Sequence, residues 1–349
     1  NKFAKSIYIH IPFCAAICSY CSFARTATHS DNTSIRDYLQ LLEKEIIQTK
    51  AHLGVRTITA SSIYIGGGTP TLLNAADLDF LFTIINKNFD YNQDTEFTLE
   101  GSPDTITYEK LSIARNNGAN RLSMGIESFN PTILKNIRRS HTIHDIKNAI
   151  ESSKELNFNS TNIDLIRGLP QYTNDMIAND VEQYIDLNIE SLTSYQYIIK
   201  PKSIDSKIYQ PQELKLDNLA QHVYFIKLMQ KNNFKQQQPL IDWFTANDSR
   251  SFVHNSEKWN NNHELLGFGL GAYGYVNNTQ YINFESRSAY ANSILNNLSP
   301  VAKATSLSQD QANLRRIIFG LKSFSLLSKS PLGILGIVVA IGAAIQGGV

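Results

Sequence analysis

Residues 6–23 read SIYIHIPFCAAICSYCSF, a short strand pattern that runs directly into a loop with three cysteines. The β-branched and aromatic residues up to Ile11 predict a strand that ends at Pro12. Cys14, Cys18 and Cys21 are the only cysteines of the chain. Thiolates gathered by a tight loop are soft ligands that select iron–sulfur clusters, zinc or copper. Three protein ligands are one short of a closed zinc site, so this loop favours a metal centre with one open coordination position.

Two simpler interpretations of the loop stay open at this point. The three thiols could be unrelated, or a zinc site could be completed by His10 or His29. The tight clustering of the cysteines and the strand pattern directly before them argue against both.

Strands and helices alternate downstream of the loop. Helical spacing of apolar residues and capping signals predict helices at 34–53, from Asn74, at 107–118, from Asn130-Pro131, at 142–156 and at 175–187. Strand patterns follow the same rhythm at 62–65, 96–100, 121–126, 162–166 and 191–197. Each parallel neighbour needs a crossover, so the sequence predicts an α/β fold with a parallel sheet. We expect a partial (β/α)6 TIM-type barrel, although an open doubly wound sheet would fit the same rhythm.

Polar and glycine-rich residues stand where these predicted strands end. Gly66–Pro70 follows the second strand, and Glu100, Glu127 and Asp164 lie toward the ends of the third, fourth and fifth. Barrels and open α/β sheets place their ligands at the carboxyl ends of the strands. We therefore expect these residues and the cysteines to surround one cavity.

Composition narrows the class of protein. The 349 residues include 32 Lys+Arg and 31 Asp+Glu, which give a net charge of +1. The chain therefore has no broad positive potential that would attract nucleic acid. A hydrophobic content of 42% with 18% charged residues is typical of a globular protein. The chain shows no signal-peptide pattern, and its three cysteines cannot form a closed set of disulfides. We expect a cytoplasmic protein that does not bind nucleic acid.

The cysteine loop and the Gly-Gly-Gly-Thr-Pro stretch together resemble the radical S-adenosylmethionine (SAM) proteins. Within this family, the chain resembles the coproporphyrinogen-oxidase-like branch in segments 10–14, 66–71, 120–127 and 162–170. The resemblance extends over about residues 6–275. It implies a 4Fe-4S cluster on Cys14, Cys18 and Cys21, with SAM chelating the open iron. Reduction would then cleave SAM to a 5′-deoxyadenosyl radical, so the cofactor supplies the difficult chemistry.

The resemblance also implies a set of SAM contacts when it is carried over position by position. They are Tyr8, Tyr20, Gly67, Gly68, Thr69, Glu100, Glu127, Arg139, Asp164, Ile198 and Tyr273. Glu100 corresponds to the carboxylate near the methionine amino group, and Asp164 to an acceptor for the ribose. Glu127 departs from the family pattern, which has glutamine there. A glutamate keeps the acceptor, loses the amide donor and adds charge.

Two functions within the branch must be separated. The oxygen-independent coproporphyrinogen III oxidases continue the cluster motif to a fourth cysteine, and this chain has Phe23 at that position. HemW-type heme chaperones lack the fourth cysteine, so they are the favoured relatives. His254-Asn255-Ser256-Glu257-Lys258-Trp259 resembles their heme motif, with Lys258 in place of tyrosine. The resemblance implies that His254, Asn255 and Trp259 bind heme and that the protein passes the heme to heme-accepting proteins. The alternative functions are a coproporphyrinogen III oxidase and a noncatalytic protein with a structural metal site.

The sequence predicts three regions along the chain. Residues 1–205 form the barrel, 206–290 a connecting and site-closing region, and 291–349 a truncated helical region with an apolar tail. Helices are expected at 212–232 and 313–327. Residues 331–349 carry no charge and reach the lower limit for a membrane span, but a buried tail, an altered terminus or a hydrophobic contact would fit equally well. A membrane-bound heme acceptor would suit the chaperone hypothesis.

Overall fold

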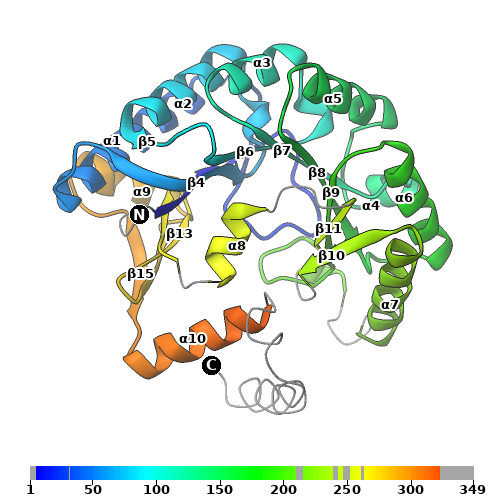
Figure 1. Ribbon diagram of the computed structural model, residues 1–349. Coiled ribbons are helices and arrows are strands. Elements are labelled where there is room, and N and C mark those ends of the chain that lie inside the picture. The colour runs from blue at the N-terminus through cyan, green and yellow to red at the C-terminus, as the bar shows by residue number, and fades with distance from the viewer. Residues whose placement is uncertain are drawn as a thin grey trace.

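The computed structural model describes residues 5–30, 32–209, 215–238, 243–246, 252–260 and 263–322. Six parallel strands form the middle of one curved sheet (Figure 1). In spatial order, which is also chain order, they are β1 (Lys5–Ile11), β4 (Ile58–Gly67), β6 (Glu96–Gly101), β7 (Arg121–Glu127), β8 (Ser160–Arg167) and β9 (Ser191–Gln196). Each pairs in parallel with the next, so the predicted partial (β/α)6 barrel is confirmed.

The crossover helices lie on the outer, convex face of this sheet (Figure 1). They are α1 (Ser34–Leu53), α2 (Ala75–Asn88), α3 (Tyr108–Asn116), α4 (Pro131–Asn136), α5 (Ile143–Glu155) and α6 (Asn174–Asp186). Their ends follow the signals in the sequence. Asn74 accepts a hydrogen bond from the Asp77 backbone N–H at 2.8 Å, and Gly54 ends α1 with φ +66°.

Residues alternate along each central strand between two environments. On β6, Phe97 and Leu99 are fully buried in the apolar core beneath the helices. Glu96, Thr98 and Glu100 occupy the alternate positions and point to the concave side. The concave side of this strand is therefore polar. Its polar residue at the carboxyl end, Glu100, is one of the candidate site residues.

Strands from the C-terminal half extend the sheet at both ends. Next to β1 lies the parallel strand β12, followed by an antiparallel series, and β9 is continued by two antiparallel strands. These strands are β12 (Leu265–Phe268), β13 (Tyr273–Val276), β14 (Thr279–Asn283) and β15 (Val301–Ser306) at one end, and β11 (Trp243–Ala246) and β10 (Phe234–Gln238) at the other. The three predicted regions stay a prediction, and the structure adds that the two later regions contribute strands to the sheet of the first.

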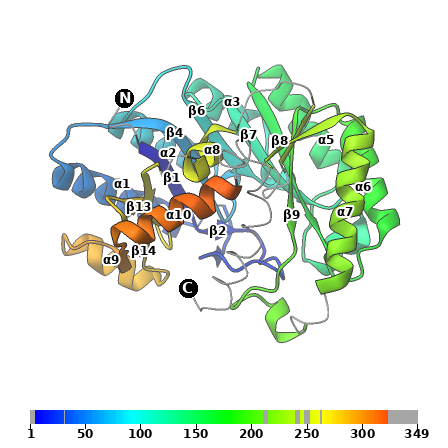
Figure 2. The same cartoon turned by 60° about the horizontal axis from the view of Figure 1, so that its bottom comes forward.

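The described residues of the C-terminal half contain four more helices. They are α7 (Lys215–Lys231), α8 (Val253–Asn260), α9 (Arg287–Leu295) and α10 (Gln309–Lys322). Helix α8 lies inside the curve of the sheet, and α10 packs against it across the open side (Figure 1, Figure 2). The end of the predicted helix at 313–327 and the start of the one at 212–232 fall outside the described residues.

The described residues contain no helix with the length and apolar character required to cross a membrane. The apolar stretch at 331–349, on which the membrane hypothesis depended, lies outside them.

Candidate functional site

The three cysteines follow β1 on a loop that is fixed at both ends. Cys14 belongs to the short strand β2 (Phe13–Cys14), which pairs with β3 (Thr26–Ala27). In the middle of the loop, the Cys21 N–H donates to the Cys18 carbonyl at 3.3 Å. All three are free thiols, and all three line the same cavity of about 340 Å³.

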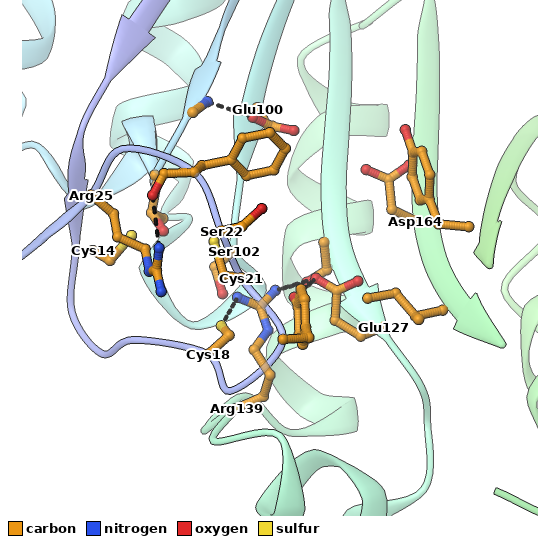
Figure 3. A pocket seen from close by; sticks show the side chains of 18 of the residues that line it. Cys14, Cys18, Cys21, Ser22, Arg25, Glu100, Ser102, Glu127, Arg139 and Asp164 are labelled. Atoms are coloured by element: carbon orange, nitrogen blue, oxygen red, sulfur yellow. Dashed lines mark hydrogen bonds and ion pairs between the residues drawn. The ribbon is translucent and has the colours of Figure 1, made fainter. Parts of the chain in front are cut away.

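This cavity, which we call the cofactor pocket, lies at the carboxyl ends of the central strands (Figure 3). The side chains that Figure 3 labels come from the cysteine loop and from the loops and ends of β6, β7 and β8. The predicted site residues that line it are Cys14, Cys18, Tyr20, Cys21, Gly67, Gly68, Thr69, Glu100, Glu127, Arg139, Asp164 and Ile198. The cysteines and the polar residues at the strand ends, which we expected to surround one cavity, therefore line the same pocket.

The donor set fits a cluster with three protein ligands better than a closed zinc site. His10 is already engaged, because its Nε2 lies 2.7 Å from the Ala24 carbonyl and its Nδ1 lies 2.9 Å from the Tyr8 hydroxyl. Burial raises the pKa of the Cys14 thiol to about 11, so this thiol stays protonated until a metal displaces the proton.

The glycine segment after β4 packs directly on the cysteine loop. The Gly68 N–H donates to the Ile11 carbonyl at 2.8 Å, and the Thr69 N–H to the Phe13 carbonyl at 2.7 Å. A Cβ at position 68 would lie 2.6 Å from the Phe13 oxygen and 2.9 Å from the Cys14 sulfur. Only glycine therefore lets this backbone approach the metal-binding loop so closely.

The three carboxylates of the pocket, those of Glu100, Asp164 and Glu127, all have raised pKa values. Glu100 accepts hydrogen bonds from the Gly67 N–H at 2.9 Å and from the Tyr64 hydroxyl at 3.1 Å, and burial raises its pKa to about 7. Asp164 accepts from the Asn162 amide at 2.8 Å. Burial, together with the nearby charges of Glu100 and Glu127, raises the pKa of Asp164 to about 8. These carboxylates lie close enough to repel one another, and a cationic ligand between them would relieve that repulsion.

Glu127 does not stand free in the pocket. Its Oε1 accepts a hydrogen bond from the Tyr20 hydroxyl at 2.7 Å and lies 3.4 Å from Arg139 Nη2. Arg139 Nη1 in turn lies 3.9 Å from the Cys18 sulfur (Figure 3). Burial raises the pKa of Glu127, and the adjacent guanidinium opposes that shift.

Three of the predicted SAM contacts lie elsewhere or at the rim. Ile198 borders the cofactor pocket with 55% of its side chain exposed. Tyr8 and Tyr273 line a second cavity of about 400 Å³, which we call the inner cavity, rather than the cofactor pocket. Gly67, Glu100, Ser22 and Phe23 line both cavities, so the two are neighbours.

The predicted heme residues lie on α8, and His254 lines the inner cavity. His254 is 5% exposed, its Nδ1 lies 2.9 Å from the Ser62 hydroxyl, and its ring centre lies 5.3 Å from that of Tyr64. Asn255 is half-buried, and the side chain of Trp259 lies outside the described part of the chain. The structure therefore places His254 in the inner cavity, whereas the cysteines line the cofactor pocket.

Some residues of the barrel interior were not predicted from the sequence. Arg121 is buried at the start of β7, and its guanidinium lies 3.8 Å from the centre of the Phe252 ring. Tyr195 and Lys200 line the cofactor pocket beyond β8. The period-two pattern of β7 carried the signal for Arg121, since Arg121, Ser123, Gly125 and Glu127 share one face.

Three free thiols at the carboxyl-end mouth of such a barrel are the ligand set expected of an iron–sulfur protein in which one iron stays open to a second ligand. Comparison of the sequence with protein families agrees with this class, because the model of the radical SAM superfamily matches residues 8–183. The chain belongs to the radical SAM superfamily and, within it, to the HemW-type branch.

The relatives of known name divide between two functions. Heme chaperone HemW of Bacillus subtilis is 32% identical over 93% of this chain and 85% of its own length. Oxygen-independent coproporphyrinogen III oxidase of Escherichia coli is 34% identical, but over 63% of this chain and 49% of its own length. Among solved structures, coproporphyrinogen III oxidase (HemN) from Escherichia coli matches with a TM-score of 0.79 and 28% identity, covering 92% of this chain and 76% of that one.

Proposed function

We propose that this chain binds heme and transfers it to acceptor hemoproteins, while it carries a 4Fe-4S cluster and SAM in the cofactor pocket. The observation that carries the proposal is the extent of the match to HemW, which covers 93% of this chain. Phe23 supports it, because the oxidase pattern places a fourth cysteine there.

Each pocket residue has a role that its geometry supports. Cys14, Cys18 and Cys21 would hold the cluster, and the Gly67–Thr69 backbone would approach the methionine part of SAM. Glu100 would hold the methionine ammonium as a charge-assisted partner, and Asp164 would accept from the ribose hydroxyls. When bound to a reduced cluster, SAM supplies reductive cleavage of a sulfonium C–S bond.

Heme is the ligand that we assign to the region around His254. Neutral imidazole is a common ligand of heme iron, and His254, which lines the inner cavity, is our candidate for that role. The inner cavity beside His254 is lined by Tyr8, Tyr64 and Tyr273, which could contact the faces of a tetrapyrrole. The acceptor is a hemoprotein, and a membrane-bound acceptor remains part of the hypothesis.

The second candidate function is oxidative decarboxylation of coproporphyrinogen III, which the similarity to the Escherichia coli oxidase structure favours. An anaerobic assay on reconstituted protein separates the two. With SAM, reductant and coproporphyrinogen III, we expect no protoporphyrinogen IX, whereas heme preloaded on the protein should pass to an apo-hemoprotein. Protoporphyrinogen together with 5′-deoxyadenosine would make the chain an oxidase. An active oxidase as positive control makes a negative result meaningful.

A further inference from the structure

The side chains of Tyr20, Glu127 and Arg139 form a network against Cys18, which we call the Cys18 network. Figure 3 shows Arg139 between Cys18 and Glu127. Arg139 approaches the Cys18 sulfur with Nη1 at 3.9 Å and the Glu127 carboxylate with Nη2 at 3.4 Å. Arg139 Nη2 also donates to the Gly125 carbonyl. The guanidinium therefore lies between a thiol that we assign to the cluster and the carboxylate of Glu127, and Asp104 is a second, weaker electrostatic partner.

The backbone fixes this arrangement. Glu127 has φ +68°, and the pairing of β7 with β8 shifts register between Gly125 and Glu127. A Cβ at position 125 would lie 2.8 Å from both Arg139 Nη2 and Glu127 Oε1. Glutamate in the left-handed region is unfavourable, so the bulge holds the carboxylate in a conformation that an unconstrained strand would not adopt.

The carboxylate adds a charge rather than a hydrogen bond. The family pattern has glutamine at position 127, and a glutamine Oε1 could accept from the Tyr20 hydroxyl as Glu127 Oε1 does, whereas the contact of Glu127 with Arg139 is an ion pair. What glutamate contributes is one negative charge beside a guanidinium. The side chains of Arg139 and Glu127 are only 12% and 10% exposed, so solvent screens that charge weakly.

We infer that Glu127 is a positioning residue that balances the charge of Arg139 beside Cys18 and lowers the reduction potential of the cluster. Reduction adds one electron, delivered by an external one-electron donor, to the cluster. Arg139 stabilises that added negative charge, and Glu127 opposes it. Net charge and hydrogen bonds to the cysteine sulfurs are the terms by which a protein sets such a potential. The inference rests on the proposed cluster site.

The test is a dithionite titration of the full chain with reconstituted cluster and without SAM, followed by electron paramagnetic resonance (EPR). Glu127→Gln should shift the equilibrium toward the reduced cluster by about tenfold, which is about 59 mV more positive for one electron. Glu43→Gln is the matched control, because it removes the same charge from an exposed pair with Lys87. This control should titrate like the unmodified chain.

Two further variants keep the inference open to disproof. Arg139→Gln should shift the reduction potential in the negative direction. If Glu127→Gln fails to hold a cluster, an unchanged potential in Arg139→Gln would overturn the inference. Glu127→Asp keeps the charge and should stay near the unmodified potential. The inference is overturned if Glu127→Gln holds a full cluster at an unchanged potential, or if Glu127→Asp moves as far as Glu127→Gln. Absence of any reducible cluster in the unmodified chain would instead contradict the proposed function.

Discussion

Both ends of the barrel contain carboxylates removed from water. Those at the carboxyl end line a cavity, whereas those at the amino end accept hydrogen bonds from the protein. At the carboxyl end, Glu100 and Asp164 line an open cavity beside the cysteines. At the amino end, helix α8 fills the barrel: Glu96 accepts from the Val253 N–H at 2.8 Å and the His254 N–H at 2.9 Å. Glu257 likewise accepts from the hydroxyls of Ser6, Ser61 and Ser62.

The contrast shows what separates a binding carboxylate from a structural one. Both kinds are removed from water, and a buried carboxylate needs partners. At the amino end the protein supplies those partners, from α8 for Glu96 and from β1 and β4 for Glu257, so the carboxylates hold the helix. At the carboxyl end part of the surface is left to a ligand, so we expect substitutions there to change binding before stability.

The largest effect is expected at the cysteines. Cys14→Ala removes one of three ligands from a cluster that has no spare protein thiol, since the chain has three cysteines. The variant should lose nearly all cluster iron and sulfide and the associated visible absorption. Ser22→Ala, which changes another residue of the same pocket, is the control and should retain the cluster. A Cys14→Ala protein with a full cluster would remove this loop from the site.

A smaller effect is expected for Glu100→Gln. Loss of the charge that faces the methionine ammonium should weaken SAM binding about tenfold to a hundredfold, as measured by calorimetry. Because the pKa of Glu100 is about 7, SAM affinity should rise as the pH increases through 7 and this carboxyl ionises. The variant should lose that part of the pH dependence, while the exposed Glu182→Gln should keep both affinity and profile. Equal affinity in Glu100→Gln would contradict the assigned role.

Glu96→Gln tests the opposite end of the barrel. A neutral amide accepts more weakly than a carboxylate from the two N–H groups that begin α8, so local stability should fall by about 1.5 kcal/mol. Amide hydrogen exchange over residues 253–260 should become faster, and heme affinity should fall with it, since His254 lies on this helix. SAM affinity should stay within twofold. A loss of SAM binding without faster exchange would break the distinction between the two ends.

The smallest effect is expected for Tyr64→Phe. Tyr64 donates one of the two hydrogen bonds to Glu100, and the Gly67 N–H would remain. Removing it should weaken SAM binding about fivefold. Because that hydrogen bond lowers the pKa of Glu100, the midpoint of the pH profile should move upward. An unchanged midpoint would show that Tyr64 does not act on Glu100.

Local signals in the sequence were enough to predict most of the barrel. The helix at 34–53 has the predicted bounds, and Asn74 and Asn130 cap their helices as expected. The positions of the cysteines, Glu100, Glu127 and Asp164 after or near the ends of parallel strands predicted that they share one cavity, and all of them line the cofactor pocket. Periodicity and capping depend on neighbours in the chain, so they can be read without the fold.

Contacts between distant segments could not be predicted in this way. Nothing near Leu265 indicates that β12 pairs with β1, and nothing near Glu96 indicates that it holds the start of α8. The inner cavity around Tyr8 and Tyr273 depends on the same pairing. Even at Glu127, the sequence revealed the departure from the family pattern but not that Arg139 lies beside it.

The central claim is that the carboxyl-end pocket holds a cluster with one iron for SAM. Its most direct test is the EPR spectrum of the reduced, reconstituted protein with and without saturating SAM. We predict that SAM changes the spectrum of the unmodified chain, because it binds the cluster itself. Identical spectra, from protein with a full and reduced cluster, would contradict the account.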